Sequence, residues 1–343
     1  MPFLLVAAGA VHVIDFRYHV VSIVAVFLAL TVGLVIGSSY LSKIAYDGLN
    51  HQLSVLRSEN QSLHGVQDQL SAQVRDRDAL LAALGPDAVS GKLTGHAVAV
   101  VLLPGADGST GEALTDLLGK AGATLTGEVT LKSGLLDPAQ NSKLAQVASK
   151  LPPTARGGAQ LAASATTTTP DKTAAAAAAL ADIAGAVVQR IPATSSGVGG
   201  QHISDAAAGQ VLSAYSTAGF ADVKYASTTA ADLVVVLAPS APTAGSSADT
   251  ANTLYLGFLK DLAGGGRSDG AVLAGPASAA VSPGLLAAAV KDGWASKNVS
   301  TADSADKDAG RIITVFALAE EATGKTGHYG LTGTADGPLP DLH

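Results

Sequence analysis

Residues 20–42 read VVSIVAVFLALTVGLVIGSSYLS and contain no Asp, Glu, Lys or Arg. At a rise of about 1.5 Å per residue, a helix of this length extends about 35 Å, more than the hydrocarbon thickness of about 30 Å of a bilayer. A cleaved signal peptide is the main alternative, because the stretch lies near the N-terminus behind Arg17. Its apolar core is longer than that of a signal peptide, and no A-x-A cleavage site follows it. We therefore predict an uncleaved transmembrane helix over residues 19–42.

Small residues recur at every fourth position of this stretch, namely Ala25, Ala29, Gly33 and Gly37. In an α-helix they lie along one face, and Gly33 and Gly37 form a G-x-x-x-G motif. In lipid, close backbone approach at small residues brings helices together. Small residues are also common in apolar spans generally, so chance is the alternative. We interpret these four positions, called the small-residue stripe below, as a surface for self-association.

The orientation of the span cannot be read from local charge, because Arg17 precedes it and Lys43 follows it. An N-terminal anchor of this type normally leaves its N-terminus in the cytoplasm. The lack of cysteine is compatible with an oxidising exterior, although it also fits a reducing compartment. We expect a single-pass protein of the cell membrane, with residues 1–18 cytoplasmic and the C-terminal domain extracytoplasmic. We also expect residues 1–12 to precede the true start, which we place at Val13; a short second hydrophobic turn on the cytoplasmic face is the alternative.

Apolar residues continue beyond the span at alternating steps of four and three. They are Leu49, Leu53, Leu56, Leu63, Leu70, Val74, Leu81 and Leu84. With Leu53 at position a and Leu56 at position d, the pattern predicts a coiled coil over residues 43–84 that ends at Gly85-Pro86. Asn60 falls at position a, where it favours a parallel two-stranded coil. We predict a parallel homodimer or a pairing with a different coiled-coil partner; a lone amphipathic helix packed on its own domain is the alternative.

From residue 92 onward, short valine-rich runs alternate with helical stretches. Strands are predicted over residues 96–103, 124–131, 221–226, 232–238, 270–274 and 311–316. Helices are predicted over residues 110–121, 140–150, 174–189, 204–218, 250–262 and 284–294. This alternation predicts an α/β fold, a Rossmann-like domain over residues 92–325 with a mostly parallel sheet. The Gly- and Pro-rich residues 326–343 are predicted to form a flexible tail.

The sequence offers little support for catalysis or nucleic-acid binding. The net charge of −7 and an aromatic content of 4% argue against a nucleic-acid partner. The glycine-rich turn over residues 104–111 has neither a G-x-G-x-x-G motif nor a Walker lysine, so we interpret it as a tight turn between a strand and a helix. The acidic residues Asp303, Asp306 and Asp308 are expected in a solvated loop. We predict that the chain is not an enzyme.

Metal ligands are sparse in the sequence. None of the eight histidines lies three or four residues from another, the spacing that would place two on one helix face. His328 and His343 share the tail and are the only weak candidates, and isolated surface histidines are the better interpretation. The chain has no cysteine and Met1 as its single methionine, so the soft ligands that copper(I) prefers are missing. The residues themselves predict no cofactor.

Three strings of the sequence together carry a family resemblance. They are VIDFRYHVVSIVAVFLALTVGLVIGSSYL at residues 13–41, LRSENQSL at residues 56–63 and GRIITVFALAEEATGKTGHYG at residues 310–330. With them, the chain resembles, over about residues 13–330, the MctB family of actinobacterial envelope proteins, usually called copper transporters.

The resemblance implies a role in copper homeostasis or efflux, described for mycobacterial members as pore formation in the outer envelope. Copper as a bound species is implied by the resemblance only. A related corynebacterial member instead resembles a partner in a division-linked complex that tunes cell-wall hydrolysis, so a dimeric coiled-coil scaffold of the envelope is the alternative function. Because a single helix cannot enclose an aqueous path, transport would require oligomerisation or a partner.

Overall fold

The computed structural model describes residues 16–152, 173–189, 202–226, 230–243, 245–264, 268–332 and 335–340. The chain divides into two compact units, Met1–Arg75 and Asp76–His343. The second unit is longer at both ends than the predicted domain of residues 92–325. The expected start at Val13 lies outside the described residues.

Helix α1 (Phe16–Val89) supplies the described part of the first unit. Within it, Phe16–Gly37 is long and apolar enough to cross a membrane, and no part of that window is buried. This confirms the predicted apolar N-terminal helix, with bounds of 16–37 in place of 19–42. The residues from Ser38 onward are also helical but more polar.

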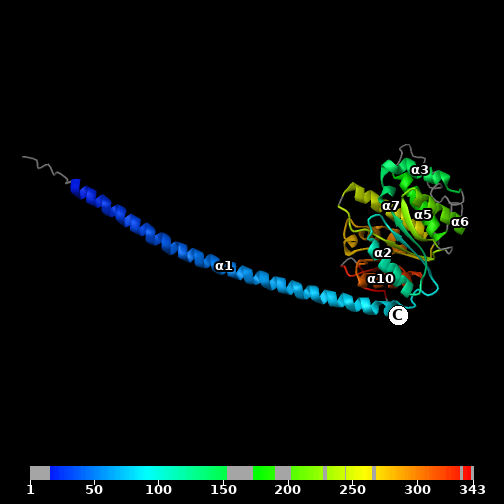
Figure 1. Cartoon of the computed structure of the whole chain (residues 1–343), viewed down its shortest axis with the longest axis horizontal. Helices are drawn as coiled ribbons and strands as arrows, with labels where there is room; N and C mark the ends of the chain where they lie inside the picture. The colour runs from blue at the N-terminus through cyan, green and yellow to red at the C-terminus, as the bar shows by residue number, and fades with distance from the viewer. Residues whose placement is uncertain are drawn as a thin grey trace, which may run out of the picture. The chain divides into compact units, whose positions relative to one another are not determined.

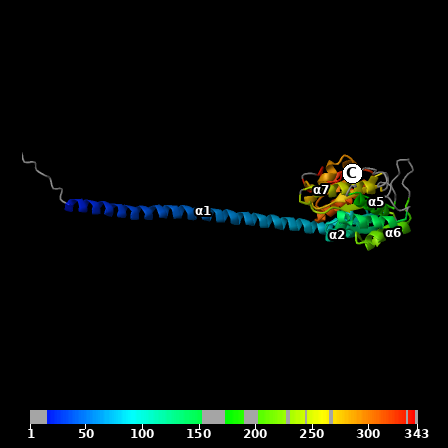
Figure 2. The same ribbon diagram turned by 90° about the horizontal axis from the view of Figure 1, so that it is seen from above.

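The predicted helix end at Gly85-Pro86 is wrong, since α1 continues to Val89 with Pro86 inside its last turns. A proline inside a helix removes one backbone hydrogen bond. Packing opposes this cost, because Val89 is fully buried and a Cβ added at Gly85 would lie 2.7 Å from Cδ1 of Ile312. These last turns of α1 lie beside α2 in the second unit (Figures 1 and 2).

A seven-stranded sheet in the order β3-β2-β1-β4-β5-β6-β7 forms the centre of the second unit. Its strands are β1 (Ala97–Leu102), β2 (Thr124–Leu131), β3 (Ala221–Ala226), β4 (Leu233–Leu237), β5 (Gly270–Ala274), β6 (Ser300–Ala302) and β7 (His328–Tyr329). Only the β2–β3 pair is antiparallel among the described pairs. This confirms the mostly parallel sheet. The strand order reverses between β1 and β4, which is the switch point of a Rossmann-like fold.

Two hydrophobic layers cover the sheet. In β4, Leu233, Val235 and Leu237 face one layer, whereas Val234 and Val236 face the other. Figure 1 shows α2 and α10 on the first side of the sheet and α3, α5, α6 and α7 on the second. A strand buried on both faces needs a continuous apolar run rather than an alternating one. The valine run of β4 therefore fits its central place.

The described helices of this unit largely follow the predicted ranges. They are α2 (Gly108–Lys120), α3 (Asn141–Lys150), α5 (Ala174–Val188), α6 (Asp205–Thr217), α7 (Ser246–Ala263), α8 (Leu285–Lys291), α9 (Ala295–Asn298) and α10 (Asp308–Glu321), with 3₁₀ turns at Ser133–Leu135, Pro138–Gln140 and Ala277–Ala280. The helix predicted over residues 284–294 is too long, because α8 ends at Lys291 and a separate helix, α9, begins at Ala295. The Oδ1 atom of Asp292 accepts the backbone N–H of Trp294 at 3.0 Å and of Ala295 at 2.8 Å.

The strand predicted over residues 311–316 is also wrong, since these residues form the middle of helix α10. Their β-branched side chains are buried among other core residues, and a short buried run has the same pattern in a strand as in a helix. The sheet instead gains β6, only three residues long, and β7 in the segment predicted as a flexible tail.

Candidate functional site

The small-residue stripe lies on the apolar part of α1. Ala25, Ala29, Gly33 and Gly37 are all exposed in the single chain, and a Cβ added at Gly33 or Gly37 would meet no atom within 4 Å. The stripe is therefore open to another helix. On the opposite face of the helix, the hydroxyl of Thr31 donates back to the carbonyls of Phe27 and Leu28 at 2.9 Å.

The predicted heptad residues follow on the same helix. Leu53, Leu56 and Leu63 are 40%, 59% and 69% exposed, and Asn60 between them is exposed too. Large apolar side chains at heptad spacing lose contact with water when two helices pair. The coiled coil stays a prediction.

The glycine-rich turn leads from β1 into α2, and its acidic residue caps the helix. Oδ2 of Asp107 accepts the hydroxyl of Ser109 at 2.6 Å, and the N–H and hydroxyl of Thr110 at 2.9 and 2.7 Å. These hydrogen bonds, led by that from Ser109, lower the pKa of Asp107 to about 2. A phosphate at this helix N-terminus would meet a carboxylate that already holds the donors. The geometry therefore favours the interpretation as a tight turn.

The crevice at the switch point between β1 and β4 is acidic as well. It has a volume of about 260 Å³, and its lining includes Asp107, Asp306 and Ser240. This is where nucleotides bind in Rossmann-like folds. Two carboxylates on its wall make the crevice unsuited to a phosphate group.

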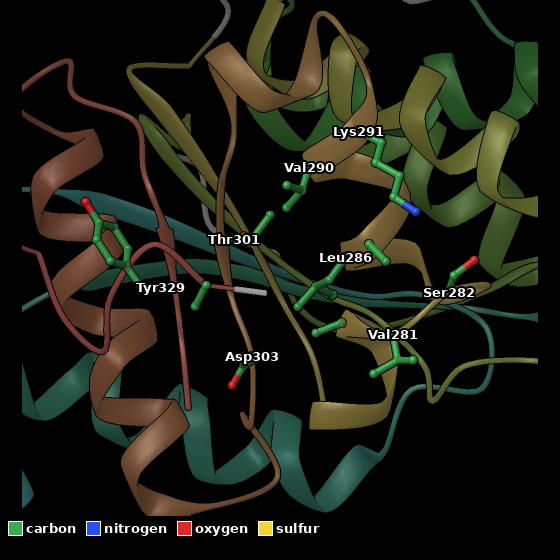
Figure 3. A pocket seen from close by; sticks show the side chains of 11 residues that line it. Val281, Ser282, Leu286, Val290, Lys291, Thr301, Asp303 and Tyr329 are labelled. Atoms are coloured by element: carbon green, nitrogen blue, oxygen red, sulfur yellow. The ribbon is translucent and has the colours of Figure 1, made fainter. Parts of the chain in front are cut away.

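A smaller, mostly apolar cavity of about 170 Å³ lies at the β6–β7 edge of the sheet. Figure 3 shows Leu286 and Val290 on its wall and the hydroxyl of Tyr329 pointing away from them. That hydroxyl donates to Oε2 of Glu320. Lys291 is exposed at the same cavity.

Asp303, at the end of β6, is buried with 2% of its surface exposed, which corrects its expected place in a solvated loop. Its carboxylate accepts the N–H groups of Leu331 and Thr332 at 2.8 and 3.1 Å. The hydroxyl of Ser304 donates to it at 2.7 Å, and that of Thr332 donates to it too. Asp303 therefore holds residues 331–332 against the sheet edge, a segment that the sequence predicted to be flexible.

Three further buried carboxylates, Glu128, Asp182 and Glu321, were not singled out in the sequence. Glu321 accepts the N–H and hydroxyl of Ser300 at 2.7 and 2.6 Å, and burial raises its pKa to about 7. Asp182 in α5 accepts the hydroxyl of Tyr215 at 2.9 Å. A signal for Asp182 exists, since α5 is apolar all round and is therefore buried, so its aspartate needs a partner.

The sequence comparisons bear on all of these features. The family described as "Copper transport outer membrane protein, MctB" matches residues 13–340. The chain belongs to the MctB family.

Curated relatives of the MctB family match over almost their whole length. The copper transporter MctB of Mycobacterium bovis and that of Mycobacterium tuberculosis are each 29% identical over 341 residues, covering 95% of this chain and 98% of the relative. The copper transporter MctB of Mycobacterium leprae is 29% identical over 325 residues, covering 93% and 96%. The MctB match thus includes both the apolar helix and the α/β domain.

The two candidate metal ligands are not brought together in the described part of this MctB-family chain. Nδ1 of His328 lies 3.0 Å from the hydroxyl oxygen of Thr301 across the β6–β7 pair, and His343 lies outside the described residues. Another histidine, His96, pairs instead with Asp232 at 3.2 Å. Among the described residues, no three His, Cys, Asp or Glu side chains form a group that could hold a metal ion.

Proposed function

We propose that this MctB-family chain acts in copper homeostasis or efflux as an oligomeric membrane protein whose α/β domain lies outside the cytoplasm. The observation that carries the proposal is the family match over residues 13–340, which includes the membrane-spanning candidate Phe16–Gly37. The mycobacterial relatives named above are called copper transporters.

Physical constraints make self-association part of this proposal. One helix has no lumen, so it cannot enclose a water-filled path across a bilayer. Several copies of α1 could do so. The open small-residue stripe and the exposed heptad leucines are the two surfaces through which copies would pair.

The metal-ligand content of the chain favours a role in forming a transport path over a role in binding and storing copper. Copper(I) binds best to thiolate and thioether sulfur, yet the sequence has no cysteine and one methionine. The described residues hold no cluster of three metal-binding side chains. Copper is therefore assigned as cargo that passes an assembly, and not as a resident cofactor of one chain.

The test is the copper content of cells that lack this chain. Deletion should raise cellular copper and sensitivity to added copper, and the wild-type gene should restore both. Gly33→Ile with Gly37→Ile should fail to restore them, because branched side chains block close helix approach. Leu34→Ile, next to the stripe, is the matched control and should restore both. Unchanged copper in the deletion strain would overturn the proposal.

A further inference from the structure

A groove of about 690 Å³ lies between α3 and α6, which both contact α5 on one face of the sheet (Figure 1). Its α6 wall is made of small and polar side chains, and a Cβ added at Gly209 would meet no atom within 4 Å. The groove is therefore open and lacks bulky side chains on that wall.

The α3 wall carries two cations. Lys143 and Lys150 both line the groove and are exposed. Seven residues apart, they lie on one face of α3 about 10 Å from each other along the axis. Nζ of Lys143 also lies 5.2 Å above the ring of Phe220. The described lining of the groove contains no Asp or Glu, although the whole chain has a net charge of −7. The groove is therefore a local basic site on an acidic protein.

The remaining polar lining suits hydroxyl groups. Gln146 on α3 faces the groove from one side, and Gln210, Ser213 and Thr217 face it from α6. Amides and hydroxyls can both donate and accept hydrogen bonds, as sugar hydroxyls require. The lining offers no deep apolar pocket for the Leu or Phe anchors of a partner helix, the residues through which such helices bind. The groove therefore matches a sugar polymer better than an amphipathic helix.

We propose that the α3–α6 groove binds an anionic glycan, with Lys143 and Lys150 pairing with its negative groups and the amides and hydroxyls bonding its sugar hydroxyls. This inference goes beyond the copper role and does not depend on it. The site lies entirely on the second unit.

The first test measures binding of a labelled galacturonic acid oligomer to the full chain in uncharged detergent. Fluorescence anisotropy should show binding that weakens with salt, because exposed charge pairs are screened. Lys143→Gln with Lys150→Gln should weaken it about twofold to thirtyfold, as expected for the loss of two exposed charge pairs. Lys291→Gln with Lys297→Gln removes the same charge elsewhere on the domain and should leave binding unchanged.

The second test fills the groove without removing charge. Gly209→Tyr places a ring in the open space and should weaken binding of the galacturonic acid oligomer at least about tenfold, because most of its contacts are blocked. Gly257→Tyr is the matched control, since Gly257 is also a helical glycine with no atom within 4 Å of an added Cβ. This control should bind as the wild type does.

Two competitors decide the class of ligand. A neutral maltose oligomer should compete poorly and an oligoglutamate peptide should compete less well than the uronic acid oligomer. Lysine-dependent binding of oligoglutamate alone would overturn the glycan assignment in favour of an acidic peptide. The assignment of the groove as a binding site would be overturned if the uronic acid oligomer did not bind. It would also be overturned if the groove double variant and the control double variant weakened binding equally.

Discussion

At the scale of single residues, Asp303 is the best-connected buried carboxylate described above. Replacing it with alanine would leave the N–H groups of Leu331 and Thr332 without their acceptor. Loss of hydrogen bonds to a charged group and exposure of unsatisfied donors should lower the free energy of unfolding by about 2–4 kcal/mol. Urea unfolding of the full chain, followed by the fluorescence of the single tryptophan, Trp294, measures this change.

A local readout accompanies that measurement. Asp303→Ala should also speed trypsin cleavage after Lys325, because the segment beyond it is no longer held at the sheet edge. Asp336→Ala changes an exposed aspartate of the same segment and should alter neither quantity. Equal cleavage rates in wild type and Asp303→Ala would contradict the role given to this carboxylate.

Glu321 makes the stability of the domain depend on pH. Its pKa is raised from 4.5 to about 7, so between these values the folded chain holds a proton that the unfolded chain releases. The free energy of unfolding therefore falls as pH rises through this window, by up to about 3 kcal/mol. Glu321→Gln removes this contribution and keeps an oxygen that can accept from Ser300.

Unfolding at pH 5 and at pH 8 gives the comparison. The loss of stability between these two pH values should be smaller in Glu321→Gln than in the wild type. Glu59→Gln, an exposed glutamate of α1, should leave the wild-type difference unchanged. If Glu321→Gln loses as much unfolding free energy between pH 5 and pH 8 as the wild type does, burial does not raise the pKa of Glu321.

Residue-level prediction from the sequence was weakest for these buried acids. Asp303 lies in the polar string STADSADKD of residues 300–308, which is typical of a solvated loop. Its burial depends on backbone donors 28 and 29 residues away. Local sequence carries no sign of such partners. The spacing of Ala25, Ala29, Gly33 and Gly37, in contrast, needs only the helix period to place the residues on one face.

At the scale of elements, prediction succeeded where pattern and length agreed. The ranges of β1, β2, β4 and β5 follow from short runs of apolar or β-branched residues between turns. The strand prediction for residues 311–316 was wrong because a short buried helix segment and a buried strand have the same apolar composition. The 14-residue length of α10, which indicates a helix, becomes visible only when the flanking alanines and glutamates are included. Strand β6 has three residues, too few for any period to show.

The heptads of α1 give a prediction at this scale, because the chain contains no cysteine. A single cysteine at Leu56 or Leu63, both d positions, should form a disulfide between two chains in membranes after mild oxidation. In a parallel coil the two copies of a d residue face each other, within the Cα distance of about 4.4–6.8 Å that a disulfide needs. Gel mobility without reductant measures the linked fraction.

The control is Ser58→Cys, at an outward-facing f position of the same heptad. It should link about tenfold less than Leu56→Cys, since f residues of paired helices point apart. Equal linkage at Ser58 and Leu56 would indicate collision of chains without a defined register. No linkage at either d position would favour a lone helix.

For the whole molecule, the proposed orientation can be checked with the same cysteine-free background. Lys297→Cys places a thiol on an exposed residue of the α/β domain, and Arg17→Cys places one at the N-terminal end of the apolar helix. In right-side-out vesicles, a membrane-impermeant maleimide should label position 297 at once and position 17 only after permeabilisation. The reverse order would put the domain in the cytoplasm and overturn that part of the proposal.

The two pairing surfaces of α1 wind around the helix in opposite directions. On a helix of 3.6 residues per turn, residues four apart are rotated about the helix axis by about +40° relative to each other. Residues seven apart are rotated by about −20°. Helices joined through small residues four apart cross at about −40°, and heptad-paired helices cross at about +20°. One straight pair of α1 helices therefore cannot satisfy both surfaces.

Copies of the chain satisfy both surfaces if each pairs with one neighbour through its heptads and with another through its stripe. Such an assembly holds more than two membrane helices, as an enclosed path requires. Single Ala29→Cys and single Leu56→Cys should then each give two-chain products on oxidation with iodine, while the double variant should give larger ladders. A double variant that stops at two chains would show that one pair of helices uses both surfaces, and the path would then need a different protein to complete it.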